Sequence, residues 1–181
     1  MFALSGAALL AGCGFRPLYR KADPEAGRDS SLADIRILNV KTNRRQDDRL
    51  GQKMHNLLLD RLNPSGRPTR PLYSLETTLT VSRERTGIEI TEEATRARLT
   101  VSTSFVLRNT RGGKPLLTGT ERSVNSYNIV DSEFASLSAE NDAAERAVRE
   151  ISDSIRLRLT VFFQRPRNGA DFDDRRTGPR Q

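Results

Sequence analysis

The residue types that perform most nucleophilic and acid–base chemistry in proteins are scarce here, since Cys13 and His55 are the single cysteine and the single histidine. One cysteine excludes an intramolecular disulfide, and this pair argues strongly against a zinc site or a histidine-based triad. His55 lies beside an apolar helical stripe without a partner in the pattern, so we interpret it as a partly exposed surface residue. No nucleophile elbow, phosphate loop or suitably placed carboxylate pair occurs. The sequence predicts no enzyme activity, no cofactor and no metal site.

Cys13 follows an uncharged apolar stretch, residues 1–12, whose length suits the apolar region of a secretory signal peptide. The pattern Leu10-Ala11-Gly12-Cys13 resembles the bacterial lipobox, in which small residues admit the signal peptidase and the cysteine receives a diacylglycerol. A thiolate is the nucleophile that this alkylation needs. Several acyl chains on one residue attach a protein stably to a membrane. We predict that residues 1–12 are removed and that Cys13 is lipidated.

The alternative for Cys13 is a buried structural thiol after a short helix, which the flanking Gly12 and Gly14 make unfavourable. No Lys or Arg precedes the apolar run, so the usual basic start of a signal peptide is missing and the true start codon stays open. Gly14, rather than Asp, follows the cysteine, and by resemblance to enterobacterial lipoproteins this favours sorting to the outer membrane. We expect a domain held at the periplasmic face of that membrane.

The charge of the chain is strongly positive, at +7 with a pI of about 10.3. Such a charge suits a polyanionic partner, whether nucleic acid, anionic lipid or a phosphorylated glycolipid head. Because Lys and Arg are interspersed with Asp and Glu, much of this charge also fits a solvated surface without a binding role. After residue 12 no apolar run approaches the roughly 20 residues of a membrane-spanning helix.

Two helices are predicted from apolar residues at three- and four-residue spacing. The first covers 46–62 and stops at the Pro and Gly of residues 63–66. The second begins near Asp131 or Ser132 and ends before Pro166, with an apolar stripe that should cover a sheet.

Strands are predicted at 34–40, in two alternating stretches that begin at Tyr73 and Arg96, and at 115–124 after a glycine-containing turn. The residues between the two alternating stretches, Arg83 to Thr95, are expected to extend them as a projecting hairpin. The inward positions are Tyr73, Leu75, Thr77, Leu79 and Val81, and Ala97, Leu99, Val101, Thr103, Phe105 and Leu107.

The order β-α-β-β-β-α predicts an α+β two-layer sandwich, with two helices on one face of a mainly antiparallel four-stranded sheet. We divide the chain into a signal peptide (1–12), the lipidated cysteine with a flexible tether (13–31), a single α+β periplasmic domain (32–165) and a disordered tail (166–181).

The run Gly14-Phe15-Arg16-Pro17-Leu18-Tyr19 resembles LptE, the lipopolysaccharide-assembly lipoprotein family, whose members often carry Gly-Phe-x-Pro-Leu-Tyr after the lipidated cysteine. The element order and residues 141–147 before the final helix resemble this family more loosely. The resemblance implies a non-enzymatic role: an outer-membrane lipoprotein that sits within the LptD β-barrel and helps lipopolysaccharide reach the outer leaflet. It would act as plug, folding aid and candidate lipopolysaccharide binder.

Arginines on the predicted strands are the candidate lipopolysaccharide contacts, because guanidinium groups form charge-assisted hydrogen bonds with phosphates such as those of lipid A. No family motif aligns them, and solvated outward positions are the alternative interpretation. The candidates are Arg83, Arg85, Arg96, Arg98 and Arg122.

Two other functions stay open at this point. An auxiliary lipoprotein of an ABC-type lipid transporter would share the anchor and a similar small domain. A basic nucleic-acid-binding domain would explain the high pI, but the chain has few aromatic residues and no recognisable binding motif. We therefore expect an LptD-type barrel, lipopolysaccharide and the outer membrane as partners, and no nucleic acid.

Overall fold

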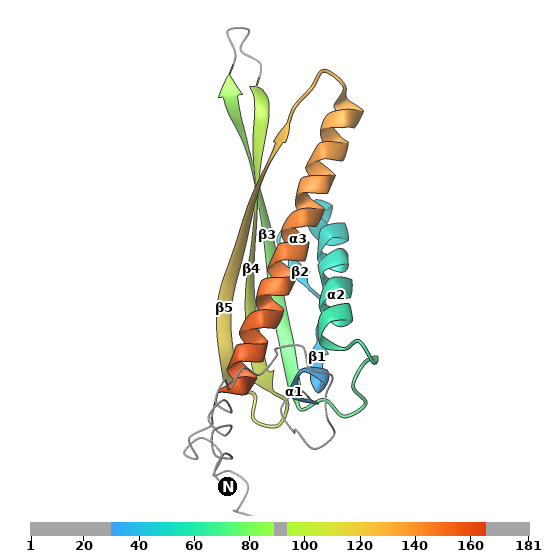
Figure 1. The fold of residues 1–181 in the computed structure, drawn as a ribbon, viewed down its shortest axis with the longest axis vertical. Helices are drawn as coiled ribbons and strands as arrows, with labels where there is room; N and C mark the ends of the chain where they lie inside the picture. The colour runs from blue at the N-terminus through green and yellow to red at the C-terminus, as the bar shows by residue number, and fades with distance from the viewer. Residues whose placement is uncertain (1–29, 89–93, 166–181) are drawn as a thin grey trace, which may run out of the picture.

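The computed structural model of this protein describes residues 30–88 and 94–165, which form two layers (Figure 1). One layer is a long sheet, and the other consists of helices α2 (Asp48–Leu62) and α3 (Glu133–Gln164) on one of its faces. Cys13, Ile90 and the predicted tail lie outside the described residues, so what was predicted for them stays a prediction. The predicted α+β class and the order of the main elements are confirmed.

Three long strands make up most of the sheet: β3 (Tyr73–Ile88), β4 (Ala94–Asn109) and β5 (Pro115–Asn128). They pair in sequence order as antiparallel neighbours, so that Tyr73 lies opposite Asn109 and Thr103 opposite Glu121. The predicted hairpin formed by the first two of these strands is confirmed, and it projects past the core.

The sheet has five strands rather than the four predicted, because the expected strand 34–40 forms β1 (Ile35–Ile37) and β2 (Lys41–Thr42). Both pair in parallel with β3, which makes the sheet mixed. The cause is the connection through α2: a chain that returns to a sheet through a helix re-enters it in the same direction.

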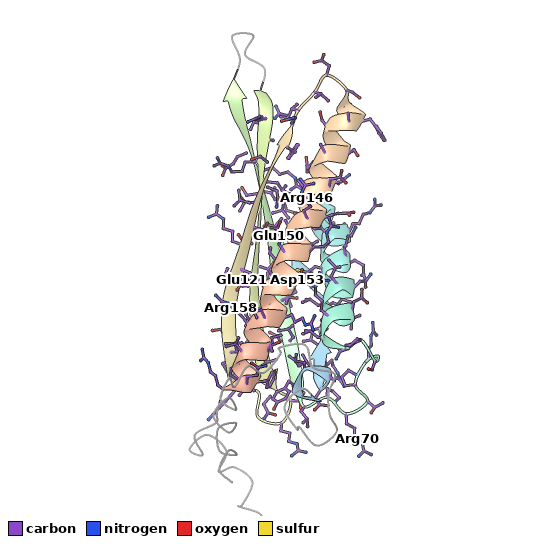
Figure 2. The ribbon with its side chains drawn as sticks, in the orientation of Figure 1. Arg70, Glu121, Arg146, Glu150, Asp153 and Arg158 are labelled. Atoms are coloured by element: carbon purple, nitrogen blue, oxygen red, sulfur yellow. The ribbon has the colours of Figure 1, made fainter. Side chains whose placement is uncertain are left out.

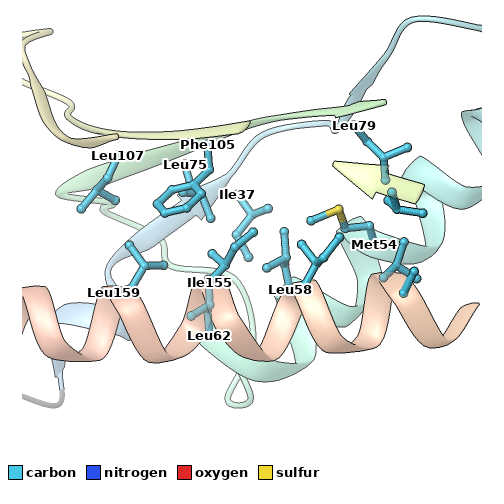
Figure 3. Packing of buried hydrophobic residues seen from close by; sticks show 14 of the residues in the cluster. Ile37, Met54, Leu58, Leu62, Leu75, Leu79, Phe105, Leu107, Ile155 and Leu159 are labelled. Carbon is cyan, nitrogen blue, oxygen red and sulfur yellow. The ribbon is translucent and has the colours of Figure 1, made fainter. Parts of the chain in front are cut away.

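The core lies between the inner face of the sheet and the two helices (Figure 3). All inward positions predicted on β3 and β4 are buried, including Leu75, Leu79, Phe105 and Leu107. Each buried side chain of this size contributes roughly 2 kcal/mol relative to exposure. The helices supply the opposite wall, which includes Met54, Leu58, Leu62, Ile151, Ile155 and Leu159.

Capping residues fix where the helices begin and end. Ser132 caps α3, where its Oγ accepts a hydrogen bond from Ala135 N at 3.4 Å. A 3₁₀ turn, η1 (Arg45–Asp47), leads into α2, and Asn63 ends that helix. The buried Asn63 side chain donates from Nδ2 to Ala33 O at 3.1 Å and so joins α2 to the short helix α1 (Ser30–Ala33).

The polar inner face of β5 attaches to α3 through charged and hydroxyl side chains (Figure 2). Arg158 Nε lies 2.6 Å from Glu121 Oε1, and Ser154 Oγ donates to the other oxygen of that carboxylate at 2.6 Å. Higher along the strand, Ser123 Oγ donates to Glu150 at 2.5 Å. α3 therefore lies mainly over β4 and β5, with its apolar side chains in the core and polar side chains bound to β5.

The molecule is elongated, and we call its two opposite ends the basal end and the hairpin end (Figure 1). At the basal end the described chain begins at Ser30, β3 begins, β4 ends at Asn109 and α3 ends at Gln164. At the hairpin end β3 and β4 project and α3 begins. The strand rise of about 3.3 Å per residue places these ends roughly 50 Å apart along β3.

Candidate functional site

Arg83 lies on the inner face of β3, where it bridges two other elements. Its Nη2 donates to Asp47 Oδ1 of η1 at 3.0 Å, and its Nε donates to Glu140 Oε1 of α3 at 2.5 Å. Tyr127 of β5 donates to the other oxygen of Glu140 at 3.0 Å. Arg83 is thus occupied in holding the hairpin, the start of α2 and the upper part of α3 together.

This network changes the proton affinity of two of its members. Burial lowers the pKa of Arg83, but the hydrogen bonds to Glu140 and Asp47 outweigh burial and leave that pKa raised. Burial, together with the hydrogen bond to Glu140, raises the pKa of Tyr127. Both side chains therefore remain protonated throughout the physiological range.

Three of the five candidate arginines share the sheet face turned away from the helices, but only two of these three lie close together. Arg96 and Arg98 lie on the face of β4 turned away from the helices, near the hairpin end, with Arg98 opposite Glu84. Arg85, like Arg83, points to the helix side of β3. Arg122 lies on the outer face of β5, opposite Ser102 and nearer the middle of the sheet.

The sheet face opposite the helices, which we call the open face, is rich in hydroxyl groups. Its cross-strand rows combine Thr78 with Ser104 and Thr120, and Thr80 with Ser102 and Arg122. Small side chains of this kind leave the sheet surface flat and hydrogen-bonding rather than apolar.

The hairpin end carries exposed apolar side chains. Phe134 and Leu137 occupy the first turns of α3 with 82% and 55% exposure, and Val130 precedes them at 50%. Their spacing continues the apolar stripe that is buried farther along α3 at Val148 and Ile151. The stripe is uncovered here because α2 begins lower, alongside the middle of α3 (Figure 1).

A cavity of about 220 Å³ opens at the basal end between β1, α2 and the loop that follows α2. Arg36 and Arg67 line it, together with the buried side chains His55 and Asn63. The prediction that His55 is a surface residue is wrong, since it is 6% exposed and its Nδ1 donates to Leu38 O at 3.2 Å. Its place next to Met54 and three residues before Leu58 was the signal for burial.

Sequence reasoning missed the bridging role of Arg83 and the cavity. Strand alternation, continued from Val81, places Arg83 and Arg85 inward, so their orientation was predictable. The partners of Arg83 were not, because Asp47 and Glu140 lie 36 and 57 residues away.

Within residues 30–88 and 94–165 no helix is both long and apolar enough to cross a membrane, and no three metal-binding side chains cluster.

Solved lipoprotein structures share this fold. A candidate lipoprotein from Caulobacter crescentus matches with a TM-score of 0.57 and 22% identity, over 78% of this chain and 98% of that one. The rare lipoprotein B of Shewanella oneidensis has a TM-score of 0.54 and 11% identity, with 70% and 95% coverage. A minor lipoprotein of Acinetobacter baumannii has a TM-score of 0.53 and 14% identity, with 69% and 90% coverage. At such identities the likeness shows the fold alone.

Comparison with curated protein sequences gave no match. The family described as lipopolysaccharide assembly, LptE, matches residues 32–159, which covers α2, all three long strands and most of α3. The match includes both the Arg83 network and the open face, and it supports a role in lipopolysaccharide assembly. The chain therefore belongs to the LptE family.

Proposed function

We propose that this protein is an outer-membrane lipoprotein, anchored through Cys13, that partners an LptD-type β-barrel in lipopolysaccharide assembly. The observation that carries the proposal is the LptE family match over residues 32–159. In this role the domain acts as plug and folding aid of the barrel rather than as an enzyme. Its place of action is the periplasmic side of the outer membrane.

The open face supports a location inside a barrel. The interior of an outer-membrane barrel is polar, so a plug needs a surface that can hydrogen-bond to it. The rows that contain Thr78, Thr80 and Ser102 provide hydroxyl groups along the length of β3 and β4. A long, flat surface of this kind is suited to lie against the strands of a barrel wall.

The hairpin end supports contact with an anionic amphiphile. Arg85, Arg96 and Arg98 are exposed there, and Phe134 and Leu137 provide apolar surface at the same end. Lipopolysaccharide combines phosphate groups with acyl chains, and guanidinium groups bind phosphates through charge-assisted hydrogen bonds. Arg83 is excluded from this set by its ion pairs, and Arg122 lies apart from it.

Affinity purification tests the partnership. Tagged full-length protein, recovered from detergent-solubilised envelopes, is expected to bring down a large β-barrel protein. Recovery of inner-membrane transporter subunits without a barrel would instead identify an auxiliary lipoprotein of a lipid transporter and would overturn the proposal. Tagged protein that carries Cys13→Ala is the control for capture that depends on anchorage.

Metabolic labelling with palmitate tests the anchor. Wild-type protein should incorporate label, and Cys13→Ala should lose it and be released from membranes, because only the thiol can be alkylated. Ser126→Ala, a change on the open face, is the matched control and should retain wild-type labelling. Label at the wild-type level in Cys13→Ala would remove the anchor from the proposal.

A further inference from the structure

We propose that the basal end is a docking surface for the phosphate headgroups of an anionic lipid membrane. The inference rests on the proposed function for the anchor that brings the domain to the membrane. It goes beyond that function because it assigns an orientation: the basal end faces the lipid headgroups at the periplasmic opening of the barrel, and the hairpin end extends into the barrel.

Exposed cations from four separate segments gather at the basal end. They come from β1, from the loop between α2 and β3, from the β4–β5 turn and from the residue that follows α3. Figure 2 shows Arg70 of this group beyond the ends of the strands. The group consists of Arg36, Arg67, Arg70, Arg111, Lys114 and Arg165, all of them exposed.

These cations are available to a ligand. Among the described residues none of them forms an ion pair, whereas neighbouring Arg61 is paired with Asp153 and Arg108 with Glu76. Among the described residues few carboxylates oppose them, since Glu76 is engaged by Arg108 and the other acids of these segments are Asp34 and Asp60. Several unpaired cations close together produce a positive potential that attracts an anionic surface.

Apolar side chains accompany the cations. Leu72, which precedes β3, is 43% exposed, and Leu116, near the start of β5, is 37% exposed. Exposed apolar groups set among Lys and Arg are typical of surfaces that lie at the boundary between lipid headgroups and acyl chains. The combination distinguishes this end from a merely solvated basic surface.

The basal cavity offers a place for one headgroup. Arg36 and Arg67 line its 220 Å³, and neither has an ion-pair partner among the described residues. A phosphate that enters from the membrane side would meet both guanidinium groups, which favour the bidentate binding of phosphate oxygens.

Chain connectivity places this surface at the membrane. The described chain enters the domain at Ser30, at the basal end, and α3 also ends there. The segment from Cys13 to Ser30 spans at most about 60 Å, so an anchored domain remains close to the headgroups. Tethering raises the local concentration of the surface, and individually weak contacts are then sufficient for docking.

Trypsin accessibility of the native full chain tests the orientation. The protein is anchored in vesicles of phosphatidylcholine, with or without phosphatidylglycerol, and cleavage after Arg111, a basal site that no proline follows, is measured by mass spectrometry. We expect the anionic lipid to slow this cleavage about fivefold or more, and salt to remove the protection, because surface electrostatics are screened. Cleavage after Arg44 and Arg45, exposed residues next to the start of α2, is the internal reference and should not change. Equal basal cleavage in both kinds of vesicle would overturn the proposal.

Charge-matched variants provide the second test, in full-length protein that carries Cys13→Ala. R67Q/R70Q/R111Q/K114Q should lower binding to phosphatidylglycerol vesicles about 100-fold relative to the unsubstituted background. R44Q/R45Q/R49Q/R146Q loses the same charge away from the basal end and should bind nearly as well as that background. Equal losses in the two variants would show attraction by net charge alone and would contradict a basal docking surface.

The anchor is measured separately, by flotation of the native chain with phosphatidylcholine vesicles in high salt. Failure to float would contradict the proposed anchorage. The comparison of the two quadruple variants in the Cys13→Ala background would still show whether the basal end binds the membrane, because that binding is measured without an anchor.

Discussion

Arg83 donates a hydrogen bond to Asp47 at 3.0 Å and thereby neutralises a carboxylate that is only 1% exposed. The two residues are 36 positions apart, one on the projecting hairpin and the other at the start of α2. Asp47 Oδ2 has no hydrogen-bond partner among the described residues, so this guanidinium is the main compensation for burial of the charge.

Replacement of Arg83 should therefore destabilise the domain. Arg83→Met leaves Asp47 buried without its cation, and we expect a loss of about 2 kcal/mol in the free energy of unfolding, measured by urea denaturation. Arg85→Met, two residues along on the same face, is the control and should change stability by less than about 0.5 kcal/mol. Addition of Asp47→Asn should recover part of the loss. Equal effects of the two arginine substitutions would contradict the assigned role.

Gly119 is expected to tolerate no side chain. A Cβ at this position would lie 2.6 Å from the ring of buried Phe105 and 2.7 Å from Arg158 Nη1. Gly119→Ala should cost about 1–3 kcal/mol of unfolding free energy, because the ring is fixed within the core. Gly112→Ala is the matched control, since nothing lies within 4 Å of its added Cβ, and it should be nearly neutral. Phe105→Leu should recover stability in the Gly119→Ala background only if the ring causes the clash.

The contact between α2 and α3 through Arg61 and Asp153 predicts a dependence of stability on pH. The hydrogen bond from Arg61 lowers the pKa of Asp153 in the folded protein. This carboxylate therefore contributes stability above its unfolded pKa of about 3.9, and the contribution is lost as the pH falls through the lower folded value. Because Asp153 is 62% exposed, we expect less than about 1 kcal/mol.

Urea denaturation of Asp153→Asn and wild type between about pH 7 and pH 2 checks this prediction. The difference between them should be present at neutral pH and should vanish at the acid end. Asp142→Asn, which removes an exposed acid of α3 without an ion pair among the described residues, should differ little from wild type at any pH. A difference for Asp153→Asn that does not depend on pH would rule out the ion pair as its cause.

Lipopolysaccharide binding is expected to depend on the arginines of the hairpin end. R85Q/R96Q/R98Q should lower the affinity for lipopolysaccharide about tenfold or more, since each phosphate contact is charge-assisted. R44Q/R45Q/R49Q carries the same change in charge and should bind like wild type. Dephosphorylated lipopolysaccharide should abolish the difference between the two variants, as measured by titration at fixed ionic strength. Equal weakening of both variants would argue against specific contacts.

The fold was largely predictable because burial follows periodicity. Alternation along β3 and β4 placed Leu79 and Phe105 in the core, and helical spacing did the same for Leu58. The parallel pairing of β1 was implied by the helix that separates it from β3. The division of the predicted strand 34–40 into β1 and β2 was not predictable, because no local sequence signal marks where a strand leaves a sheet.

The candidate site was less predictable, since it depends on contacts between distant segments. Sequence patterns identified Arg96 and Arg98 as outward residues, which the structure confirms. They did not show that Arg83 meets Asp47, nor that cations from four segments converge at one end. Such groupings arise from topology rather than from local spacing.

The last helix of the fold has a consequence for how the polypeptide matures. α3 contributes Ile151, Ile155 and Leu159 to the core, and it covers β strands that were synthesised well before it. Until Gln164 has left the ribosome, those strands lack the wall against which they pack. The apolar core is therefore completed only after the C-terminal helix has been synthesised, so the domain folds after translation of α3 rather than strand by strand.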